Sequence, residues 1–562
     1  MNILGISALD KDSTATLVQD GRIIAAVSEE RLTRVKQQAG FPYKAVQTVL
    51  NLSGLHSEQI DCVAYPFFEV GKEMRLVGRN ALADVFDCWN KIRQRGLSHT
   101  FRHYGTFAKT LALDFPQKLA LCDRQLKNGL LSLGCGNKLR RYDHQYCHAI
   151  SSYFTSDFDR ALVVTSDWYG SGKAGAIYVA EGSQLKLVCE IPFPHSLGVL
   201  YAGVTSALGF IPDRHEGKIV GLAAYGDPAK LNTVLLNRFR ERRDRYDFLD
   251  PFDSQSTHEL VDNFAREDVA AGHQHILETV LLKTIVYYLK RFGLTKVACA
   301  GGVFANVKLN QKIVDLPEVE SVFVHPAMTD MGTGTGAALC AAIEVGDLAS
   351  SQPMENVFLG PFYEKKEVVD TLMNYGLRYE EVKDLPKRIA TILAEGKTVG
   401  RFEGRMEYGP RALGNRSILA STRDPSITKI LNQKLQRNDF MPFSPATLSD
   451  KASKYYINSH KVNLSAQFMT VCLRCKPAMN ATSPGTVHVD KTSRPQLVTK
   501  SSNPGLYAIL KHTEKLTGVP SVINTSFNIH EEPIVCSPKD AMRVFVAAQL
   551  DYLAIDGFLV SQ

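Results

Sequence analysis

The chain has 562 residues, of which 44% are hydrophobic and 22% are charged. This is the composition of an ordinary globular protein and excludes a disordered or fibrous one, while the length exceeds what one hydrophobic core usually organises. The formal net charge of +7 is mild and scattered along the chain, so it indicates no large nucleic-acid surface and suits a small anionic substrate.

The cellular setting follows from the cysteines and from the N-terminus. The eleven cysteines are spread too thinly for a disulfide framework, and we interpret Cys472 and Cys475 as two reduced thiols on a strand. The first residues lack the charged start of a signal peptide, and no apolar run reaches membrane-spanning length. We therefore expect a cytoplasmic protein that binds neither membrane nor nucleic acid.

Two segments share a pattern of strand, acidic turn, strand, turn, strand. This duplication is expected of actin- and hexokinase-like ATPases, although strand–turn–strand patterns are common. The predicted strands are 2–7, 14–19 and 22–27 in the first copy, and 161–167, 175–180 and 185–191 in the second.

Later segments alternate between the two kinds of secondary structure. Residues 73–139 form a predicted helical insertion, and an amphipathic helix around Leu277–Leu289 ends at Gly293 before the strand 296–300. The basic run 238–245 is interrupted by acids, so we interpret it as a solvated helix face, with a nucleic-acid patch as the alternative.

A polar, proline-containing stretch at 347–355 predicts a domain boundary. Beyond it, a helix at 384–395 and strands at 398–402 and 521–524 indicate a second α/β domain. The predicted domains are therefore 1–350 and 356–562.

Four residues suggest a metal site. His144 and His148 stand at i and i+4, so a helix would place both imidazoles on one face. Asp167 ends an apolar strand, and Asp330 precedes an apolar helix that it could cap. Two nitrogens and two carboxylates suit Fe²⁺, Mn²⁺ or Zn²⁺. Each residue alone also has an ordinary structural explanation.

Seven motifs in order resemble the O-carbamoyltransferase family that includes tobramycin, cephalosporin and nodulation-factor carbamoyltransferases. Any one motif could arise by chance, but the ordered set is specific to the family and spans nearly the whole chain. The motifs are Ser28–Arg34, His144 with His148, His195–Tyr201, Glu216–Gly226, Gly301–Asn310, Gly404–Ser417 and Asn524–Pro538.

The resemblance implies an α/β protein with an actin-like, duplicated ribonuclease-H-like N-terminal domain and a C-terminal domain similar to YrdC-like synthases. It implies that the C-terminal domain converts carbamoyl phosphate and ATP, with Mg²⁺, into carbamoyladenylate. The N-terminal domain would then transfer the carbamoyl group to an acceptor hydroxyl, or to an amine, with help from a bound iron-type metal. Natural-product biosynthesis, such as that of antibiotics, is the expected setting.

The resemblance also assigns residues to roles. Metal ligands are His144, His148, Asp167 and Asp330, and catalytic residues are Lys11, Asp12, His144 and Asp167. Residues binding carbamoyl phosphate are Arg411, Arg416, Arg437, Arg494, Asn524 and Ser526. Residues binding nucleotide are Lys218, Gly301, Gly302, Asn306, Asn310 and Gly334, the last within a glycine-rich phosphate nest.

The chain departs from the family pattern in three places. Lys11 stands where family members usually have a histidine, and Lys491 where they usually have a glycine. Around Arg437, the family's lysine, glutamate and arginine are replaced by Leu435, Asn438 and Met441, with Lys434 as a candidate substitute for the lysine.

Two alternatives follow. A hydrogenase-maturation type of carbamoyl transfer to cysteine would need an acylphosphatase module and paired CxxC zinc sites, which this sequence lacks. A catalytically reduced nucleotide-binding partner protein would account for the altered pocket. The acceptor, and whether the protein forms a homodimer, are not readable from the sequence.

Overall fold

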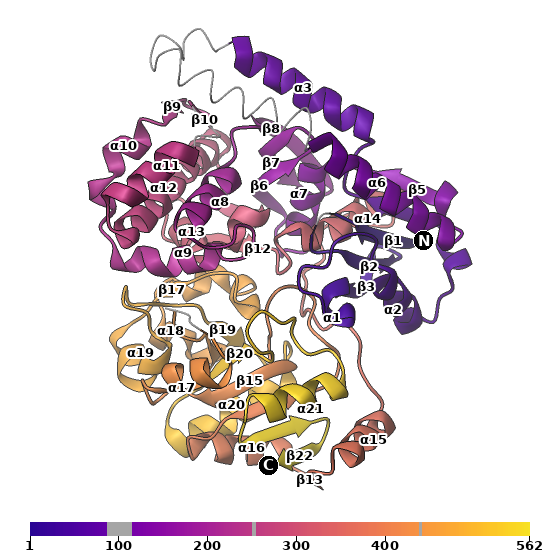
Figure 1. Ribbon diagram of the computed structural model, residues 1–562, viewed down its shortest axis with the longest axis vertical. Helices are drawn as coiled ribbons and strands as arrows, with labels where there is room; N and C mark the ends of the chain where they lie inside the picture. The colour runs from indigo at the N-terminus through magenta and orange to yellow at the C-terminus, as the bar shows by residue number, and fades with distance from the viewer. Residues whose placement is uncertain (10, 87–114, 250–253, 438–440) are drawn as a thin grey trace. The chain divides into compact units, whose positions relative to one another are not determined.

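The computed structural model describes residues 1–9, 11–86, 115–249, 254–437 and 441–562 (Figure 1). The chain forms two compact units. The N-terminal unit comprises residues 1–23, 39–43 and 55–353, and the C-terminal unit comprises 24–38, 44–54 and 354–562. The main division thus falls between Pro353 and Met354, within the polar stretch noted in the sequence. No helix in these ranges is long and apolar enough to cross a membrane.

The first sheet of the N-terminal unit has the order β3-β2-β1-β4-β5. β1 runs antiparallel to β2 and parallel to β4, and β4 runs parallel to β5. Most residues of β1, β2, β3 and β4 are buried, as expected of strands covered on both faces. Their bounds are β1 Asn2–Ser7, β2 Thr14–Gln19, β3 Arg22–Ser28, β4 Cys62–Tyr65 and β5 Leu139–Arg141.

The second sheet repeats this topology, with the order β12-β11-β6-β7-β8. Again an antiparallel meander is followed by two strands that run parallel to its first strand. The duplication predicted from the sequence is therefore present. The bounds are β6 Arg160–Gly170, β7 Lys173–Glu181, β8 Gln184–Pro192, β11 Lys296–Ala300 and β12 Ser321–Val324.

Two helices pack against each other and against these sheets. α7 (His144–Phe154) lies on the second sheet and α14 (Thr333–Glu344) on the first (Figure 1). Glycines permit this close packing, since a methyl group on Gly336 would lie 2.0 Å from the Cys147 carbonyl oxygen. Gly334 is buried in the same way against Gly5 of β1. The structure thus gives Gly334 a packing position, and its role in a phosphate nest stays a prediction.

The remaining helices of the N-terminal unit surround this centre. α6 and most of α3 fall within the predicted helical insertion, whose residues 87–114 lie outside the described ranges. The predicted helix over 238–245 is wrong, because Phe239–Glu241 (β9) and Tyr246–Phe248 (β10) pair as an antiparallel hairpin. The helices are α3 Val70–Phe86, α6 Phe115–Ser132, α8 Leu197–Ala207, α9 Glu216–Leu222, α10 Asn232–Leu236, α11 Ser254–Asn263, α12 Arg266–Phe292 and α13 Val307–Val314.

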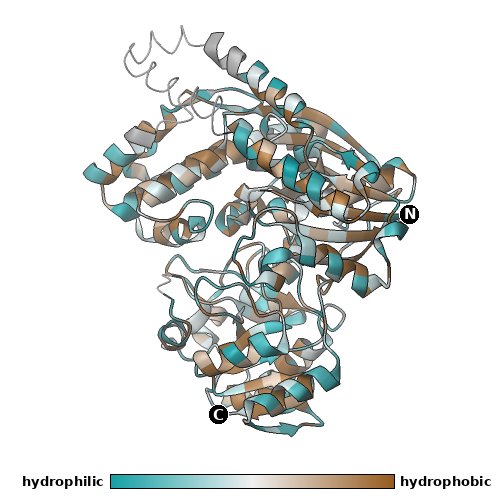
Figure 2. Ribbon diagram, turned by 45° about the vertical axis from the view of Figure 1, so that its right-hand side comes forward, coloured by the Kyte–Doolittle hydropathy of each residue, from teal (hydrophilic) through white to brown (hydrophobic). Residues whose placement is uncertain are grey.

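The C-terminal unit is built on an eight-stranded sheet with the order β13-β22-β21-β14-β15-β20-β16-β19. Successive residues of one strand serve opposite faces: Ile418 enters one hydrophobic cluster and Leu419 the other. Figure 2 shows that helices of this unit carry both hydrophilic and hydrophobic residues. The strands are β13 Arg378–Glu381, β14 Val399–Phe402, β15 Arg416–Ser421, β16 Pro445–Leu448, β19 Gln496–Val498, β20 Ser521–Ser526, β21 Tyr552–Ile555 and β22 Phe558–Ser561.

Helices cover both faces of this sheet. Residues of α16 and α20 enter one cluster, and residues of α15, α17 and α21 enter the other. A short pair, β17 Leu473–Arg474 and β18 Thr492–Ser493, lies apart from the main sheet. The helices are α15 Lys365–Tyr375, α16 Leu385–Ala394, α17 Ile427–Lys434, α18 Ala452–Tyr455, α19 Pro477–Thr482, α20 Pro504–Thr517 and α21 Pro538–Ala547.

Two segments from the start of the chain complete the C-terminal unit, including α1 (Glu29–Thr33) and most of α2 (Tyr43–Ser53). Arg34 donates hydrogen bonds to the carbonyl oxygens of Pro533 and Ile534 at 2.7 and 2.6 Å. Leu32 packs on a small apolar cluster that contains Met406 and Ile534. Nothing in the sequence pattern predicted this exchange of segments.

Candidate metal centre and anion site

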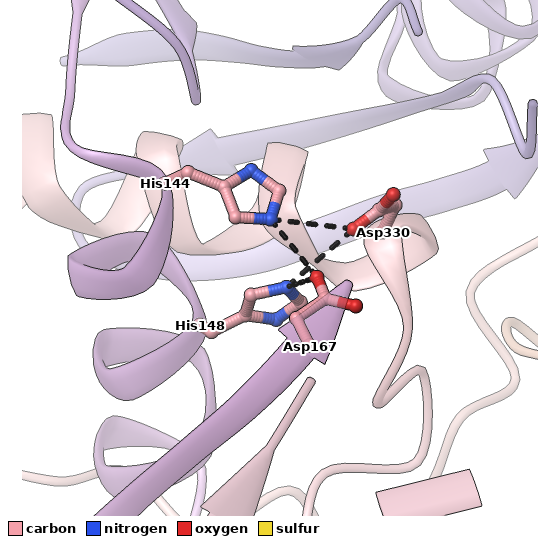
Figure 3. A group of neighbouring side chains, drawn as sticks. All are labelled: His144, His148, Asp167 and Asp330. Carbon is pink, nitrogen blue, oxygen red and sulfur yellow. Dashed lines mark hydrogen bonds and ion pairs between the residues drawn. The ribbon is translucent and has the colours of Figure 1, made fainter. Parts of the chain in front are cut away.

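Four side chains converge in the N-terminal unit (Figure 3). His144 and His148 come from the first two turns of α7, whose start is capped by Asp143 accepting a hydrogen bond from the Tyr146 N–H at 3.0 Å. Asp167 comes from β6, and Asp330 begins the short 3₁₀ turn before α14. Neither imidazole has exposed surface. The structure thus brings together the whole set that the sequence predicted.

The distances within this metal-ligand quartet suit a single ion. The Nε2 atoms of His144 and His148 each lie 3.1 Å from Asp167 Oδ2, and 3.4 and 3.5 Å from Asp330 Oδ1. Nitrogen and oxygen ligands about 2.1 Å from one ion are themselves about 3.0–3.4 Å apart. Asp330 Oδ1 is buried and accepts no hydrogen bond in the described structure. These four residues therefore fit a metal ion.

The electrostatics of the quartet point the same way. Burial alone would lower the pKa of His144, but its interactions with the carboxylates of Asp167 and Asp330 outweigh burial and raise the pKa to about 10. Burial would raise the pKa of Asp167, but the two imidazoles hold it well below its ordinary value. A divalent cation that replaced the imidazole protons would face two carboxylates and two neutral imidazoles, whose net charge of −2 it neutralises.

Backbone groups hold Asp167 in place. Its Oδ1 accepts hydrogen bonds from the N–H groups of Trp168 at 2.8 Å and Gly302 at 3.2 Å. Gly301 has φ of 107°, and a methyl group there would lie 2.2 Å from the Ser166 carbonyl oxygen. Gly301 and Gly302, which were predicted to bind nucleotide, thus lie against the strand that carries a metal ligand. Because these N–H groups bind Oδ1 of Asp167, its Oδ2 is the oxygen that faces the imidazoles.

Gly170 restricts the position of His144. A methyl group on Gly170 would lie 2.0 Å from Cδ2 of His144, so Gly170→Ala must displace the imidazole. We expect this variant to bind Mn²⁺ or Fe²⁺ about 10–100-fold more weakly, measured by titration calorimetry. Gly203→Ala in α8 is the matched control, since nothing lies within 4 Å of its new methyl group. Unchanged metal affinity in Gly170→Ala would contradict the ligand role of His144.

A cavity of about 170 Å³ adjoins the carboxylates of Asp167 and Asp330. The predicted catalytic residue Lys11 lines it, and its ammonium group donates to Asp213 Oδ1 at 2.7 Å. Burial lowers the pKa of Lys11, but attraction by Asp213 and Asp330 outweighs this and raises it above its ordinary value. Lys11 is therefore cationic at neutral pH. Asp12, beside it in the turn, is buried and has φ of 53°.

The cavity also contains a functional candidate that sequence reasoning missed. Glu73 of α3 is fully buried and accepts hydrogen bonds from the Tyr169 hydroxyl at 2.6 Å, the Phe68 N–H at 3.0 Å and the Ser171 hydroxyl at 3.1 Å. Ser171 Oγ in turn accepts from the His144 N–H at 3.0 Å. Glu73 thus links α3 to the elements that carry two ligands. A lone glutamate in an irregular helical stretch gave no signal for this.

Glu73→Ala would leave three donors without their acceptor. We expect it to lower the free energy of unfolding by about 3 kcal/mol, because each unsatisfied buried donor costs about 1 kcal/mol or more. Glu73→Gln, which retains one acceptor oxygen, should lose about half as much. Urea unfolding followed by tryptophan fluorescence measures both, with the exposed neighbour Glu69→Ala as the control. A loss in Glu73→Ala no larger than in the control would show that the network contributes nothing.

The structure gives the other predicted nucleotide-binding side chains contacts with protein groups. Asn306 caps α13 and donates to Gln274 Oε1 at 2.8 Å, and Asn310 is fully buried and donates to the Phe304 carbonyl at 2.7 Å. Lys218 of α9 lies with its ammonium 5.8 Å from the Phe210 ring centroid. Nucleotide binding by these residues stays a prediction.

In the C-terminal unit, two half-buried arginines lie close enough to repel each other. Repulsion by the charge of Arg494 is the largest cause of a lowered pKa of Arg411, and burial lowers it further, to about 9. Arg494 donates to Ser444 Oγ at 2.9 Å, while the buried Arg411 Nε has no partner. No carboxylate in the described part of the chain pairs with either guanidinium. Two uncompensated cations form an arginine pair suited to an anion.

Two other predicted residues lie near this arginine pair. Asn524 is buried and donates to Gln496 Oε1 at 2.7 Å, while its own Oδ1 lacks a partner. Its backbone N–H donates to the carbonyl of Ser444, the residue that binds Arg494. Asn524 and Arg494 therefore both hydrogen-bond to Ser444, as expected if they belong to one site.

The other arginines have different surroundings. Arg437 donates to Ser526 Oγ at 3.0 Å and to Asn528 Oδ1 at 2.7 Å, so Arg437 and Ser526 form a cluster. Arg416 has no exposed surface, and its guanidinium donates to carbonyl oxygens including those of Glu403 and Gly404 at 2.9 Å. That is a scaffolding position, and substrate binding by Arg416 stays a prediction.

The structure accounts for two departures from the family pattern. Leu435 is buried in the core of the C-terminal unit, and Lys434 donates to the Gln549 carbonyl, so neither takes the place of the missing lysine. Lys491 has φ of 62°, a conformation in which glycine is unstrained, as in the family. Asn438 lies outside the described residues, and nothing in the structure explains Met441.

Comparison with known proteins identifies relatives along the whole chain. Family models described as Carbamoyltransferase N-terminus and Carbamoyltransferase C-terminus match residues 2–339 and 390–562. Nodulation protein NolNO of Sinorhizobium fredii is 30% identical over 98% of this chain and 79% of its own. Uncharacterized protein sll1178 of Synechocystis is 31% identical over 100% and 97%. Full-length HypF in its phosphate- and nucleotide-bound form is 14% identical, covering 61% of this chain and 56% of its own, with a TM-score of 0.33 that supports no conclusion.

Proposed function

The chain belongs to the carbamoyltransferase family and is a transferase, and from this premise we propose that it makes carbamoyladenylate from carbamoyl phosphate and ATP and transfers the carbamoyl group to an acceptor hydroxyl. The observation that carries the proposal is the convergence of His144, His148, Asp167 and Asp330 at the wall of a cavity. The duplicated sheets support assignment of the N-terminal unit to the actin-like class. The C-terminal unit is proposed to be YrdC-like.

The activating half-reaction belongs to the C-terminal unit in this proposal. Water cleaves carbamoyl phosphate to carbamate and inorganic phosphate; a carbamate oxygen then attacks the α-phosphorus of ATP, and pyrophosphate leaves. Arg411 and Arg494 would bind the phosphate oxygens, because they are charged donors without a carboxylate partner among the described residues. Arg437, Ser526 and Asn524 complete the proposed substrate contacts. Mg²⁺ would accompany ATP as substrate.

The transfer half-reaction belongs to the quartet and the cavity. The acceptor oxygen forms a bond to the carbamoyl carbon, the bond from that carbon to the AMP phosphate breaks, and its electron pair leaves with AMP while the hydroxyl proton is released. A bound Fe²⁺, Mn²⁺ or Zn²⁺ would supply Lewis-acid polarisation at this site. Lys11, held cationic by Asp213, would stabilise negative charge on the departing AMP rather than accept a proton.

Pyrophosphate release tests the first half of the proposal. Purified full-length protein should release pyrophosphate from ATP only when carbamoyl phosphate is also present, and product carrying a carbamoyl group should require an added acceptor. Omission of each substrate in turn is the control. No pyrophosphate release with both substrates present would overturn the proposal and favour a nucleotide-binding partner protein.

A further inference from the structure

Six of the 18 residues that line the cavity beside the quartet are aromatic. Phe115 contacts Tyr169 edge to face with ring centroids 4.4 Å apart, and Phe67 lies 4.5 Å from the His144 ring. The aromatic surface is therefore continuous with the metal centre. The aromatic lining residues are Tyr65, Phe67, Phe68, Phe115, Trp168 and Tyr169. Such faces hold the apolar side of a flat or ring-shaped ligand.

Most charged side chains that line this cavity already interact with other protein groups. Lys11 pairs with Asp213 at 2.7 Å, and Arg141 pairs with Asp123. Glu73 accepts three hydrogen bonds from protein donors. A divalent cation bound by the quartet would match the charge of its two carboxylates. Lys118, the other charged lining residue described, is exposed to solvent.

Among the described lining residues, a charged ring would therefore find no buried counter-charge that is not already paired with another side chain or, in the case of Lys11, assigned to the departing AMP. Burial of an ion without a partner costs several kcal/mol, whereas burial of an apolar ring face against aromatic walls is favourable. The size of the cavity adds a second limit, because an apolar cavity of about 150 Å³ accommodates one benzene ring. The volume of about 170 Å³ thus admits one six-membered ring.

We propose that this cavity receives the carbamoyl acceptor and selects an uncharged alcohol that presents one six-membered ring, with its hydroxyl directed at Asp167 and Asp330. The inference rests on the proposed function and goes further by naming the acceptor class. Cationic amino sugars and acidic sugars are poor acceptors on this basis, and a neutral glycoside or cyclic alcohol is a good one.

Three probes that share one ring and differ in charge test this. Full-length protein with Fe²⁺, ATP and carbamoyl phosphate is given methyl glucoside, glucosamine below the pKa of its amine, or glucuronate. Mass spectrometry follows the carbamoylated product, and pyrophosphate is measured in parallel. We expect kcat/KM for methyl glucoside to exceed that for either charged ring at least about tenfold.

Failure of the proposed function and failure of the proposed acceptor class give different results. Absence of pyrophosphate release in every reaction overturns the proposed function. If pyrophosphate is released, equal or faster transfer to a charged ring, or no transfer to methyl glucoside, overturns the acceptor class.

A charge introduced into the wall gives an independent check. Leu119 of α6 lines the cavity, and Leu119→Glu should raise the kcat/KM ratio of glucosamine to methyl glucoside about tenfold. Leu121→Glu, on the same helix with 52% of its side chain exposed and outside the cavity lining, should leave the ratio unchanged. Retained binding of Fe²⁺ by the quartet, which lies in the same unit as both leucines, shows that each variant is folded there. An unchanged ratio in folded Leu119→Glu would place the acceptor elsewhere.

Discussion

Replacing His144 with alanine is expected to abolish carbamoyl transfer while pyrophosphate release continues. The substitution removes one of four ligand atoms that lie within 4.8 Å of one another, so metal affinity should fall by at least about 100-fold. Transfer should fall by about a thousandfold or more, because the Lewis acid is lost from the site. The arginine pair lies in the other unit, so adenylate formation should be preserved.

The control for this variant is another buried histidine of the same unit. His273 has no exposed surface and bonds through Nδ1 to the Val269 carbonyl at 2.8 Å, away from the quartet. His273→Ala should reduce stability to a similar extent without changing metal content, measured by elemental analysis. If folded His144→Ala lost both half-reactions, the assignment of one half-reaction to each unit would be wrong.

Arg411→Met is expected to remove substrate activation without destabilising the protein. The guanidinium of Arg411 is repelled by Arg494 and partly desolvated, and its pKa falls from 12.5 to about 9. A cation whose pKa is lower in the folded chain opposes folding at every pH below that value. At pH 7 the variant should therefore unfold at the same temperature as the natural protein or higher, while pyrophosphate release falls about 10–100-fold.

Ligand-induced stabilisation provides the matching measurement. ATP with carbamoyl phosphate should raise the melting temperature of the natural protein and raise that of Arg411→Met much less. Arg423→Met, a substitution at an exposed position of the same unit, should change neither quantity. A marked loss of stability in Arg411→Met without ligand would indicate that Arg411 is structural, as the contacts of Arg416 indicate for that residue.

Local patterns predicted much of the fold. The two strand meanders were readable because apolar runs alternate with acidic or glycine turns, as at Asp20 and Gly21. The position of His144 and His148 on one helix face followed from their spacing, and the motif resemblance supplied Asp167 and Asp330. These signals are local or depend on sequence similarity, so tertiary contacts were not needed to find them.

Contacts between distant segments could not be predicted in the same way. The role of Glu73 depends on hydrogen bonds to Tyr169 and Ser171, which are close only after α3 packs on the second sheet. The hairpin at 238–245 was mistaken for a helix because its charge pattern resembles a solvated helix face, while the pairing of Phe239 with Phe248 is not visible in the charges. The sequence also could not show that Arg416 is fully buried while Arg411 is not, because both arginines belong to the same motif.

The exchange of segments between the units sets the order in which the protein can be completed. Residues 24–38 and 44–54 leave the ribosome first, yet their partners, such as the carbonyls of Pro533 and Ile534 that bind Arg34, are made last. During synthesis Arg34 must therefore wait for nearly the entire chain before its carbonyl partners exist. The C-terminal unit consequently has no contiguous gene fragment that encodes it, and a polypeptide that begins at residue 354 lacks two of the segments that complete this unit.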